Sequence, residues 1–455
     1  MPDTFPPGPR DWFFGFPQMS AMQADLLGYY ARLHADYGDS VGMRFGPYLY
    51  YAFFHPDQVH EVLVSKAKHF IRLPRAMDIM SQWNGQSLLI TEGETWRKQR
   101  RMTQPAFSPR RFGGYAEAML AEIEKQADGW EAELARGPLE IDMDRATTDL
   151  TMRIIARTIF GAELGDRTAA IAKAVATLSE VAFYELSSPW VLPDWIPWPG
   201  KPDKWGAIRL LDETIRGFIR ERRASGDDRG DLLSMLIKAV DEEGDGGSMT
   251  DEQVRDQSMT FFLAGHDTTA SGLTWVWYNL ATHPEIADRI VEEVERVVGD
   301  RGVTYADLEQ LTFTEQCVKE TLRIYPPATL VFMRQTIDEV QIGDYTLAPG
   351  SLVNLCQFIT QRDPRWFPEP EKFDPDRWGP GRVDQIPQYA YFAFGGGPRV
   401  CIGQSFALTE MLLAVATQIR RFRISLAPGE KKPELLVHLS LRPKNGLKLR
   451  LEKRA

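Results

Sequence analysis

The chain is poor in cysteine, and its charge is not basic. Three cysteines occur, Cys317, Cys356 and Cys401, and they stand far apart. That number and spacing exclude a disulfide framework and a clustered-cysteine zinc site, and they suit a reducing cytoplasm. The formal net charge of −10 argues against nucleic-acid binding, because that function requires a broad basic surface.

Repeats and an early apolar run are also lacking. The first residues, MPDTFPPGPRDWFFGF, hold no apolar stretch long enough for a membrane span or a signal peptide. No internal repeat, low-complexity tract or long linker stands out, and the polar stretches 225–230 and 241–248 indicate surface loops. With 455 residues, 43% of them hydrophobic, the chain can bury a large core.

The remaining patterns predict a mainly α protein with a small β region. Residues 40–54 are rich in Tyr, Phe and Val and are broken by Gly-Pro, which predicts a hairpin. Much of 116–295 shows helical patterning, and Thr250–Gln253 and Thr282–Glu285 have the spacing of capping boxes.

One cysteine ends a glycine-rich loop. Residues 394–403 read FGGGPRVCIG, and apolar residues then repeat at helical spacing up to Ile419. A helix is therefore predicted just after Cys401, with its positive end toward the sulfur. Such an end, backbone N–H groups and a metal lower the thiol pKa from roughly 8.5 and favour the metal-binding thiolate. The alternative is a buried thiol in a turn that the glycines only shape.

A second segment combines apolar ends with a polar middle. Residues 259–280 read MTFFLAGHDTTASGLTWVWYNL, and Ser or Thr hydroxyls in such a centre can bond to an earlier carbonyl and bend a helix. Ala264 and Thr268 are four apart and share a face, whereas Asp267 points roughly 100° away. A distorted helix is predicted, although small residues can equally serve close packing of another helix.

Together these segments resemble the cytochrome P-450 family. FGGGPRVCIG matches its heme-binding signature, and AGHDTT resembles the oxygen-activation motif of its central helix. KETLRIYPP and FDPDRW resemble its structural triad, here Glu320, Arg323 and Arg377. Spacing alone is weak evidence for such a pair, because Glu293 and Arg296 share it in a helix that is expected to be solvated.

The resemblance implies a single catalytic domain over residues 1–455, with heme b (iron protoporphyrin IX) between the distorted central helix and the helix after the cysteine loop. Cys401 would be the axial iron ligand, while Asp267 and Thr268 would deliver the protons that O–O cleavage needs. Peroxide-using relatives typically lack that pair, so a monooxygenase that uses dioxygen is expected. The implied heme-binding residues are Trp96, Arg100, Ala264, Arg334, Phe394, Arg399, Cys401 and Gly403.

The resemblance also implies a hydrophobic substrate, with terpenoids and fatty acids among the options. The implied pocket residues are Leu89, Phe262, Ala264, Leu330 and Val331, although core packing explains each of them as well. Residues 181–198 resemble the family's lid. Some fatty-acid hydroxylases of the family bind the carboxylate with an Arg and a Tyr of the early sheet. Here Tyr48, Tyr50 and Tyr51 occur, but Arg44 lies before the Gly-Pro turn.

A separate electron donor is expected, because the chain has no fused flavin or iron–sulfur module. A basic group in this acidic protein would receive a ferredoxin or flavodoxin, and it comprises Arg97, Lys98, Arg101, Arg110 and Arg111. A soluble, cytoplasmic monomer without a membrane anchor is expected. The rival interpretations are a heme-thiolate sensor or electron carrier, which would need no proton relay, and a heme-free structural or zinc protein.

Overall fold

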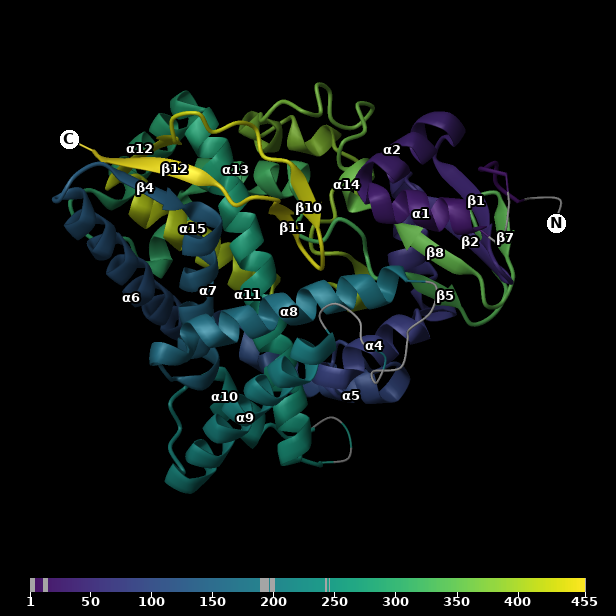
Figure 1. Ribbon diagram of the computed structural model, residues 1–455, viewed down its shortest axis with the longest axis horizontal. Coiled ribbons are helices and arrows are strands. Elements are labelled where there is room, and N and C mark those ends of the chain that lie inside the picture. Colours follow the sequence, from purple (N-terminus) through teal and green to yellow (C-terminus); the bar gives the residue numbers. More distant parts are fainter. Residues whose placement is uncertain are drawn as a thin grey trace. The chain divides into compact units, whose positions relative to one another are not determined.

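A computed structural model describes residues 5–10, 15–188, 196, 201–241, 244 and 246–454 (Figure 1). Helices make up 59% of it, which confirms the mainly α prediction with small sheets. The chain forms two compact units. Unit 1 comprises 1–79, 183–191 and 319–401, and unit 2 comprises 80–182, 192–318 and 402–455.

Unit 1 contains a five-stranded sheet in the order β1-β2-β8-β5-β3. Its strands are β1 (Ser40–Phe45), β2 (Tyr48–Phe53), β3 (Phe70–Arg72), β5 (Arg334–Thr336) and β8 (Leu352–Leu355). The predicted hairpin is confirmed, since Ser40 pairs with Phe53 across the turn at Gly46-Pro47. Successive strand residues point to opposite faces, so Tyr51 enters one core cluster and Tyr50 another.

The other elements of unit 1 are short. They are the helices α1 (Phe16–Ala24), α2 (Leu26–Tyr37), α3 (Pro56–His60) and α14 (Gln357–Thr360), and the strand pair β6 (Val340–Ile342) and β7 (Tyr345–Leu347). Three helices contribute residues to both units: α4 (Pro74–Asn84), α8 (Thr168–Ser187) and α13 (Thr312–Ile324).

Unit 2 is organised around α11 (Asp251–Thr282), which packs along α7 (Met143–Phe160) and also contacts α9 and α15 (Figure 1). Its other helices are α5 (Gly93–Thr103), α6 (Pro109–Leu134), α9 (Lys201–Ser225), α10 (Leu232–Lys238), α12 (Pro284–Val298) and α15 (Gln404–Ile419). Its strands form the antiparallel sheet β4-β12-β9 and the hairpin β10-β11. They span β4 (Leu139–Asp142), β9 (Phe422–Leu426), β10 (Leu435–Val437), β11 (Leu441–Pro443) and β12 (Lys448–Lys453).

One of the two predicted capping boxes is present. At the start of α11, the Thr250 hydroxyl accepts from the Gln253 backbone N–H at 3.2 Å, and the Gln253 side chain accepts from the Thr250 N–H at 2.9 Å. The prediction at 282–285 is wrong. Thr282 is the last residue of α11, where its hydroxyl donates to the Tyr278 carbonyl at 2.9 Å, and α12 begins with Pro284 instead.

The expectation that Glu293 is solvated is also wrong. Its carboxylate is buried and accepts from the backbone N–H groups of Phe313 and Thr314 at 2.7 and 2.8 Å. These are first-turn N–H groups of α13, which have no partner inside the helix. Arg296 is exposed as expected, so equal spacing along α12 conceals two different environments.

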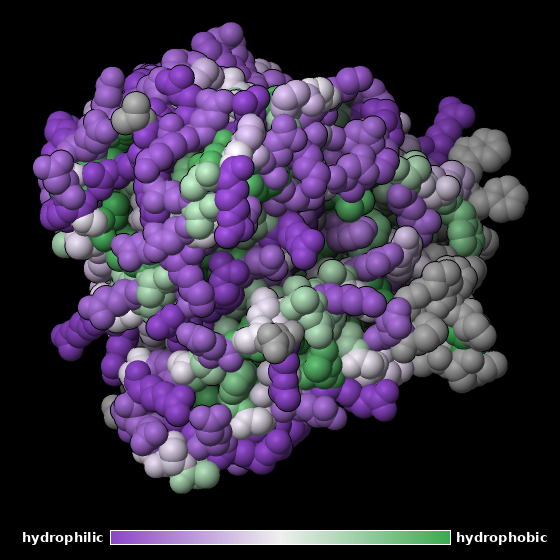
Figure 2. Space-filling view, turned by 60° about the vertical axis from the view of Figure 1, so that its left-hand side comes forward, coloured by the Kyte–Doolittle hydropathy of each residue, from purple (hydrophilic) through white to green (hydrophobic). Residues whose placement is uncertain are grey.

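One face of the described surface is mostly hydrophilic (Figure 2). Hydrophilic residues cover most of the face in Figure 2, and hydrophobic residues there form separate islands. The predicted loop at 225–230 is exposed, whereas part of the loop at 241–248 lies outside the described residues. Within the described part of the chain, no helix combines the length and the apolar character that crossing a membrane requires.

Candidate active site

The glycine-rich loop holds Cys401 at its end. The Cys401 backbone N–H donates to the Phe394 carbonyl at 3.0 Å, which closes the loop. Gly397 has a φ of +64°, and a Cβ at that position would lie 1.8 Å from the carbonyl oxygen of Leu63, so both backbone conformation and space require glycine. The predicted helix is confirmed, since α15 begins at Gln404.

Exposure separates Cys401 from the other two cysteines. Cys317 and Cys356 are buried, and burial raises the pKa of Cys356 to about 12. Cys401 is exposed, so the description as a buried thiol in a turn does not apply to it. Reactive and metal-binding thiols are typically accessible ones.

Gln361 ties the segment before this loop to α13. Its Nε2 donates to the carbonyls of Leu322 and Arg323, both at 3.1 Å, and its Oε1 accepts from the backbone N–H of Phe392 at 2.9 Å. The position of the cysteine loop within unit 1 is therefore coupled to α13 through one buried amide.

The three residues of the predicted triad lie together around one carboxylate. Glu320 is fully buried and accepts from Arg323 Nε and Nη2 at 2.8 and 2.9 Å, and from Arg377 Nε at 3.1 Å. The Asp374 backbone N–H and Trp378 Nε1 also donate to it, at 3.1 and 3.0 Å. Five hydrogen bonds to one buried carboxylate make a fixed, fully satisfied group.

The central helix α11 is mostly buried, but residues at its middle are accessible to solvent. Ala264 is exposed and Thr268 is half-buried, and the Thr268 hydroxyl donates to the Ala264 carbonyl at 2.6 Å. The predicted distortion does not interrupt the helix, which continues from Asp251 to Thr282. Close packing explains Gly265, where a Cβ would lie 2.7 Å from Cδ1 of Ile155.

Asp267 turns from this face toward the C-terminal hairpin. Its Oδ1 accepts from Arg442 Nη2 at 2.8 Å, and its side chain is 16% exposed. Burial alone would raise the pKa of Asp267, but the charges of Arg442 and His266, with hydrogen bonds from Ser440 and Arg442, hold it below its usual value. Burial lowers the pKa of His266 to about 4, so Arg442 is the cation beside Asp267 at neutral pH.

The implied heme-binding side chains divide between the units. In unit 2, Trp96 and Arg100 are both half-buried on one face of α5. In unit 1, Arg334 lies on β5, is buried, and donates from Nη1 to the Phe332 carbonyl at 2.7 Å, while Arg399 is half-buried in the cysteine loop.

These features fit a heme group in chemistry. The exposed sulfur of Cys401 can act as a thiolate ligand, and the opening on α11 leaves Ala264 accessible in an otherwise buried helix. Arginines that are partly or largely withdrawn from water, such as Arg100 and Arg334, suit the two carboxylates that heme carries.

The implied pocket residues have different surroundings. Phe262 is buried and packs against Phe160 with ring centroids 5.9 Å apart, as a core residue would. Leu89, Leu330 and Val331 are half-buried. The resemblance to a lid covers 181–198, of which 181–187 end helix α8, while 189–195 and 197–198 lie outside the described residues.

Part of the predicted basic group is neutralised. Arg97 pairs with an acid of its own helix, and Arg101 donates through Nε and Nη2 to the buried Asp241, both at 3.1 Å. Arg110 and Arg111 are exposed at the start of α6, so they are the members available to an approaching acidic surface.

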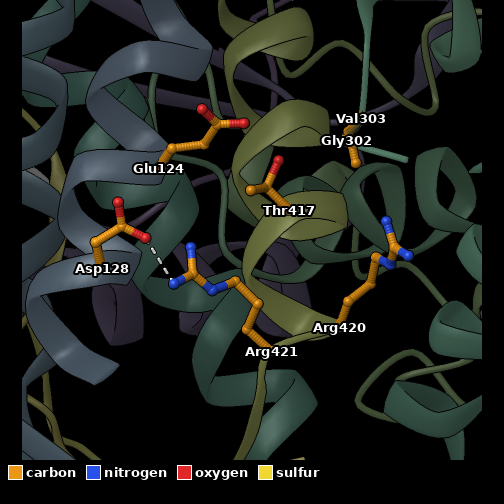
Figure 3. Close-up of a pocket in the computed structure, with 7 residues that line it drawn as sticks. All are labelled: Glu124, Asp128, Gly302, Val303, Thr417, Arg420 and Arg421. Atoms are coloured by element: carbon orange, nitrogen blue, oxygen red, sulfur yellow. Dashed lines mark hydrogen bonds and ion pairs between the residues drawn. The ribbon is translucent and has the colours of Figure 1, made fainter. Parts of the chain in front are cut away.

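A pocket of about 210 Å³ lies elsewhere in unit 2 (Figure 3). It is lined by Glu124, Asp128, Gly302, Val303, Thr417, Arg420 and Arg421. In Figure 3 the Arg421 side chain points toward Asp128, and Nη2 lies 2.7 Å from Oδ1. None of the predicted site residues lines this pocket, and its charges of both signs partly neutralise one another.

The rival interpretation as a zinc protein would need a cluster of metal-binding side chains. Among the described residues, the group of side chains close enough to hold a metal ion is His34, Asp39 and Asp363, and it contains no cysteine. Arg365 already bridges both carboxylates at 2.5 Å. The group is therefore a compensated ion-pair cluster.

Several contacts around the site were not predicted. Arg442 and Asp144 carry no motif, and Gln361 stands in an ordinary sequence, so tertiary contact alone reveals them. Trp378 had a signal, because it closes the quoted string FDPDRW beside Arg377.

Comparison with known proteins identifies the family. A family profile described as "Cytochrome P450" matches residues 6–450. Cyclooctatin synthase of Streptomyces melanosporofaciens is 37% identical over 87% of this chain and 85% of its own length. Cyclooctat-9-en-7-ol 5-monooxygenase of the same species is 34% identical (86% and 84%), and pentalenene oxygenase of Streptomyces avermitilis 32% identical (92% and 91%). The chain therefore belongs to the cytochrome P450 family and is a heme-iron monooxygenase that acts on hydrophobic molecules with a redox partner.

Proposed function

We propose that this monooxygenase oxidises a cyclic terpenoid by placing one oxygen atom of dioxygen into a C–H or C=C bond. The observation that carries the proposal is that three bacterial relatives of 32–37% identity are named for cyclooctatin, cyclooctat-9-en-7-ol and pentalenene. A relative of 30% identity over 98% of this chain is named a leukotriene-B4 omega-hydroxylase, so the substrate test below includes a fatty acid. The second oxygen atom leaves as water, with two electrons from the redox partner and two protons from solvent.

In the early sheet, the hydroxyl of Tyr50 is not available to a fatty-acid carboxylate. The Tyr50 hydroxyl is buried against that of Tyr30, which also accepts from Asn354 Nδ2 at 2.7 Å. Burial raises the pKa of Tyr50, so its hydroxyl stays neutral and committed to this cluster. A fatty-acid carboxylate could bind Tyr50 only by breaking those contacts.

We assign Cys401 as the axial thiolate and Asp267 with Thr268 as the proton-delivery pair. Bound heme supplies the oxidising chemistry, and the protein supplies the axial ligand, the protons and the orientation of the substrate. The Thr268 hydroxyl donates to Ala264, which leaves its lone pairs able to accept a hydrogen bond from water. Asp267 can exchange protons on the side of the C-terminal hairpin.

We further assign heme b as the cofactor, with Trp96, Arg100, Arg334 and Arg399 at its propionates. Phe394 and Gly403 would flank the sulfur, with Ala264 on the opposite face of the cofactor. The burial of Arg334 supports this role, because a guanidinium withdrawn from water suits a carboxylate. The pocket would include Leu89, Phe262, Leu330 and Val331.

The electron donor that we propose is an acidic ferredoxin or flavodoxin. The exposed pair Arg110 and Arg111 supports this choice, because complementary charge raises the encounter rate. We propose that residues 1–455 act as one catalytic domain, as a monomer in the cytoplasm.

The cofactor assignment is tested by the spectrum of the reduced carbon monoxide complex. Wild-type protein should give a Soret band strongly displaced to the red, which reports a thiolate ligand. Cys401→Ala should lose that band, whereas Cys356→Ala, which changes a buried thiol, should keep it. Retention of the band in Cys401→Ala would refute the assignment.

The substrate is tested by the change from low spin to high spin that accompanies loss of water from the iron. Pentalenene and cyclooctat-9-en-7-ol should produce this change and an oxygenated product, while a fatty acid such as palmitate should not. A response to palmitate alone would overturn the terpenoid proposal and leave the monooxygenase assignment standing.

A further inference from the structure

Arg442 connects the acid of the proposed proton-delivery pair to a second acid. From β11 its Nη2 donates to Asp267 Oδ1 at 2.8 Å and to the Asp267 carbonyl at 3.2 Å. Its Nη1 donates to Asp144 Oδ1 at 2.8 Å and to the Thr148 hydroxyl at 2.9 Å. One guanidinium thus joins α11, α7 and the C-terminal hairpin. Each of its two terminal nitrogens donates to one carboxylate.

This cluster has an inner and an outer side. Asp267 and Arg442 side chains are each 16% exposed, and Asp144 is 22% exposed. The Thr274 hydroxyl donates to Asp144 Oδ1 at 3.3 Å and contacts the Thr147 hydroxyl at 2.7 Å. Asp144 is therefore held in place, yet it retains more contact with water than the other two charges.

We propose that Arg442 is the positioning residue of Asp267, and that Asp144, by sharing the charge of Arg442, sets how readily Asp267 takes up a proton. The inference rests on the proposed role of Asp267 and deepens it. When Arg442 interacts more strongly with Asp144, its attraction for Asp267 weakens and Asp267 takes up a proton more readily. When Arg442 interacts more strongly with Asp267, Asp267 loses that proton. A shared cation between two carboxylates makes the two acids compete.

Of the other groups named near Asp267, none is assigned the role of the fixed cation, which falls to Arg442. His266 on α11 has a pKa lowered to about 4 by burial and is neutral at pH 7. His438, in the turn of the hairpin, also has its pKa lowered by burial, although the charges of Glu180 and Asp267 oppose that shift. Ser440 contributes a hydroxyl without charge. Arg442 has its pKa raised by Asp267 and Asp144 against the effect of burial, so it stays charged at every working pH.

The test uses two variants that should act in opposite directions. Arg442→Gln removes the cation, so burial dominates and the pKa of Asp267 should rise. Asp144→Asn removes the competitor, so Arg442 attracts Asp267 more strongly and the pKa of Asp267 should fall. The pH profile of product formed per NADPH, with pentalenene as the probe, should move to higher pH in Arg442→Gln and to lower pH in Asp144→Asn.

A second readout does not depend on turnover. The thermal midpoint of the heme-loaded protein should fall most in Arg442→Gln at neutral pH, and the difference from wild type should narrow on acidification as Asp267 becomes protonated. The matched control is Arg421→Gln, because Arg421 also holds two carboxylates, Asp128 and Glu131 at 2.7 and 2.9 Å, but on α6. It should leave the pH profile unchanged.

The outcomes distinguish a failure of this inference from a failure of the proposed role of Asp267. Shifts in the same direction, or a loss of stability in both variants with no shift, would overturn the inference. If Asp267→Asn leaves product per NADPH unchanged, the proposed role of Asp267 itself fails. If Asp267→Asn impairs coupling while Asp144→Asn causes no shift, the inference alone fails. Should Arg442→Gln not retain heme, the direction of the Asp144→Asn shift and recovery in Arg442→Lys decide.

Discussion

Two buried clusters of carboxylates and arginines, one in each unit, differ in how completely they are satisfied. In unit 1, Glu320 receives five hydrogen bonds, and neither it nor Arg323 is exposed. In unit 2, Asp267 depends on one arginine that it shares with Asp144, and all three side chains keep some contact with water. The first arrangement fixes the surrounding backbone. The second, in our proposal, also allows Asp267 to gain and lose a proton.

The difference shows how the same residue types serve two purposes. A buried ion pair with all its hydrogen-bonding groups matched fixes the surrounding backbone, and losing one partner leaves a buried charge without compensation. A carboxylate whose pKa is set by a few opposing contributions responds to small changes in those contributions. Saturation is therefore typical of a scaffold, whereas a carboxylate that shares its one arginine responds to changes at the other carboxylate.

The largest expected effect comes from the saturated cluster. Glu320→Gln keeps the shape of the side chain but leaves Arg323 and Arg377 buried without a counter-charge, so we expect a loss of about 3–5 kcal/mol in the free energy of unfolding. Urea unfolding followed by the heme spectrum measures it. A variant within about 1 kcal/mol of wild type would mean that this cluster is not a scaffold.

Acid should destabilise the region around Asp267, because it protonates the unfolded chain at His266 before the folded one. Burial lowers the pKa of His266 from 6.5 to about 4, so the unfolded chain binds more protons than the folded one between these values. Stability should therefore be complete above pH 6.5 and fall as the pH drops toward 4, by up to about 3 kcal/mol. His266→Gln should flatten the pH dependence of the thermal midpoint in this window. An unchanged slope would contradict the prediction.

A smaller effect, on chemistry and not on stability, is expected at the opening of α11. Thr268→Ala should retain heme and the thiolate spectrum but divert electrons to peroxide, with product per NADPH reduced at least about tenfold. Thr282→Ala is the matched control, because the Thr282 hydroxyl makes the same bond to a carbonyl four residues earlier at the end of the same helix. Equal uncoupling in both variants would mean that the loss of the hydroxyl bond to the helix backbone, and not the position of Thr268, causes the effect.

The smallest effect is expected at Arg296, on the exposed side of α12. Arg296→Ala should change the free energy of unfolding by less than about 0.5 kcal/mol, because exposed surface substitutions usually change stability little. Glu293→Gln should cost more, since Glu293 accepts from the first-turn N–H groups of α13. Similar results for the two variants would show that the α13 contact is unimportant. Chemical denaturation measures both.

The elements that a local pattern defines were predictable. Helical spacing located α15, the turn residues located the β1-β2 hairpin, and side-chain chemistry located the Thr250 cap. The cap expected at Thr282 failed because α11 continues through that residue and Pro284 begins the next helix. Glu293 was misjudged because spacing along one helix does not report what another element brings to it.

The site divides in the same way. Cys401, Thr268 and Glu320 stand in motifs and could be named from the chain alone. The arginine that pairs with Asp267 could not, because Arg442 is 175 positions away and stands in a short strand without a signature. Long-range electrostatic partners are properties of the folded chain.

The central strand of the β4-β12-β9 sheet has a consequence for the order of synthesis. β12 leaves the ribosome after both of its neighbours, so β4 and β9 emerge with unpaired edges and wait for it. Unpaired strand edges invite association with other chains. Chains interrupted before Lys448 should therefore leave both edges unpaired and aggregate more readily than the full chain.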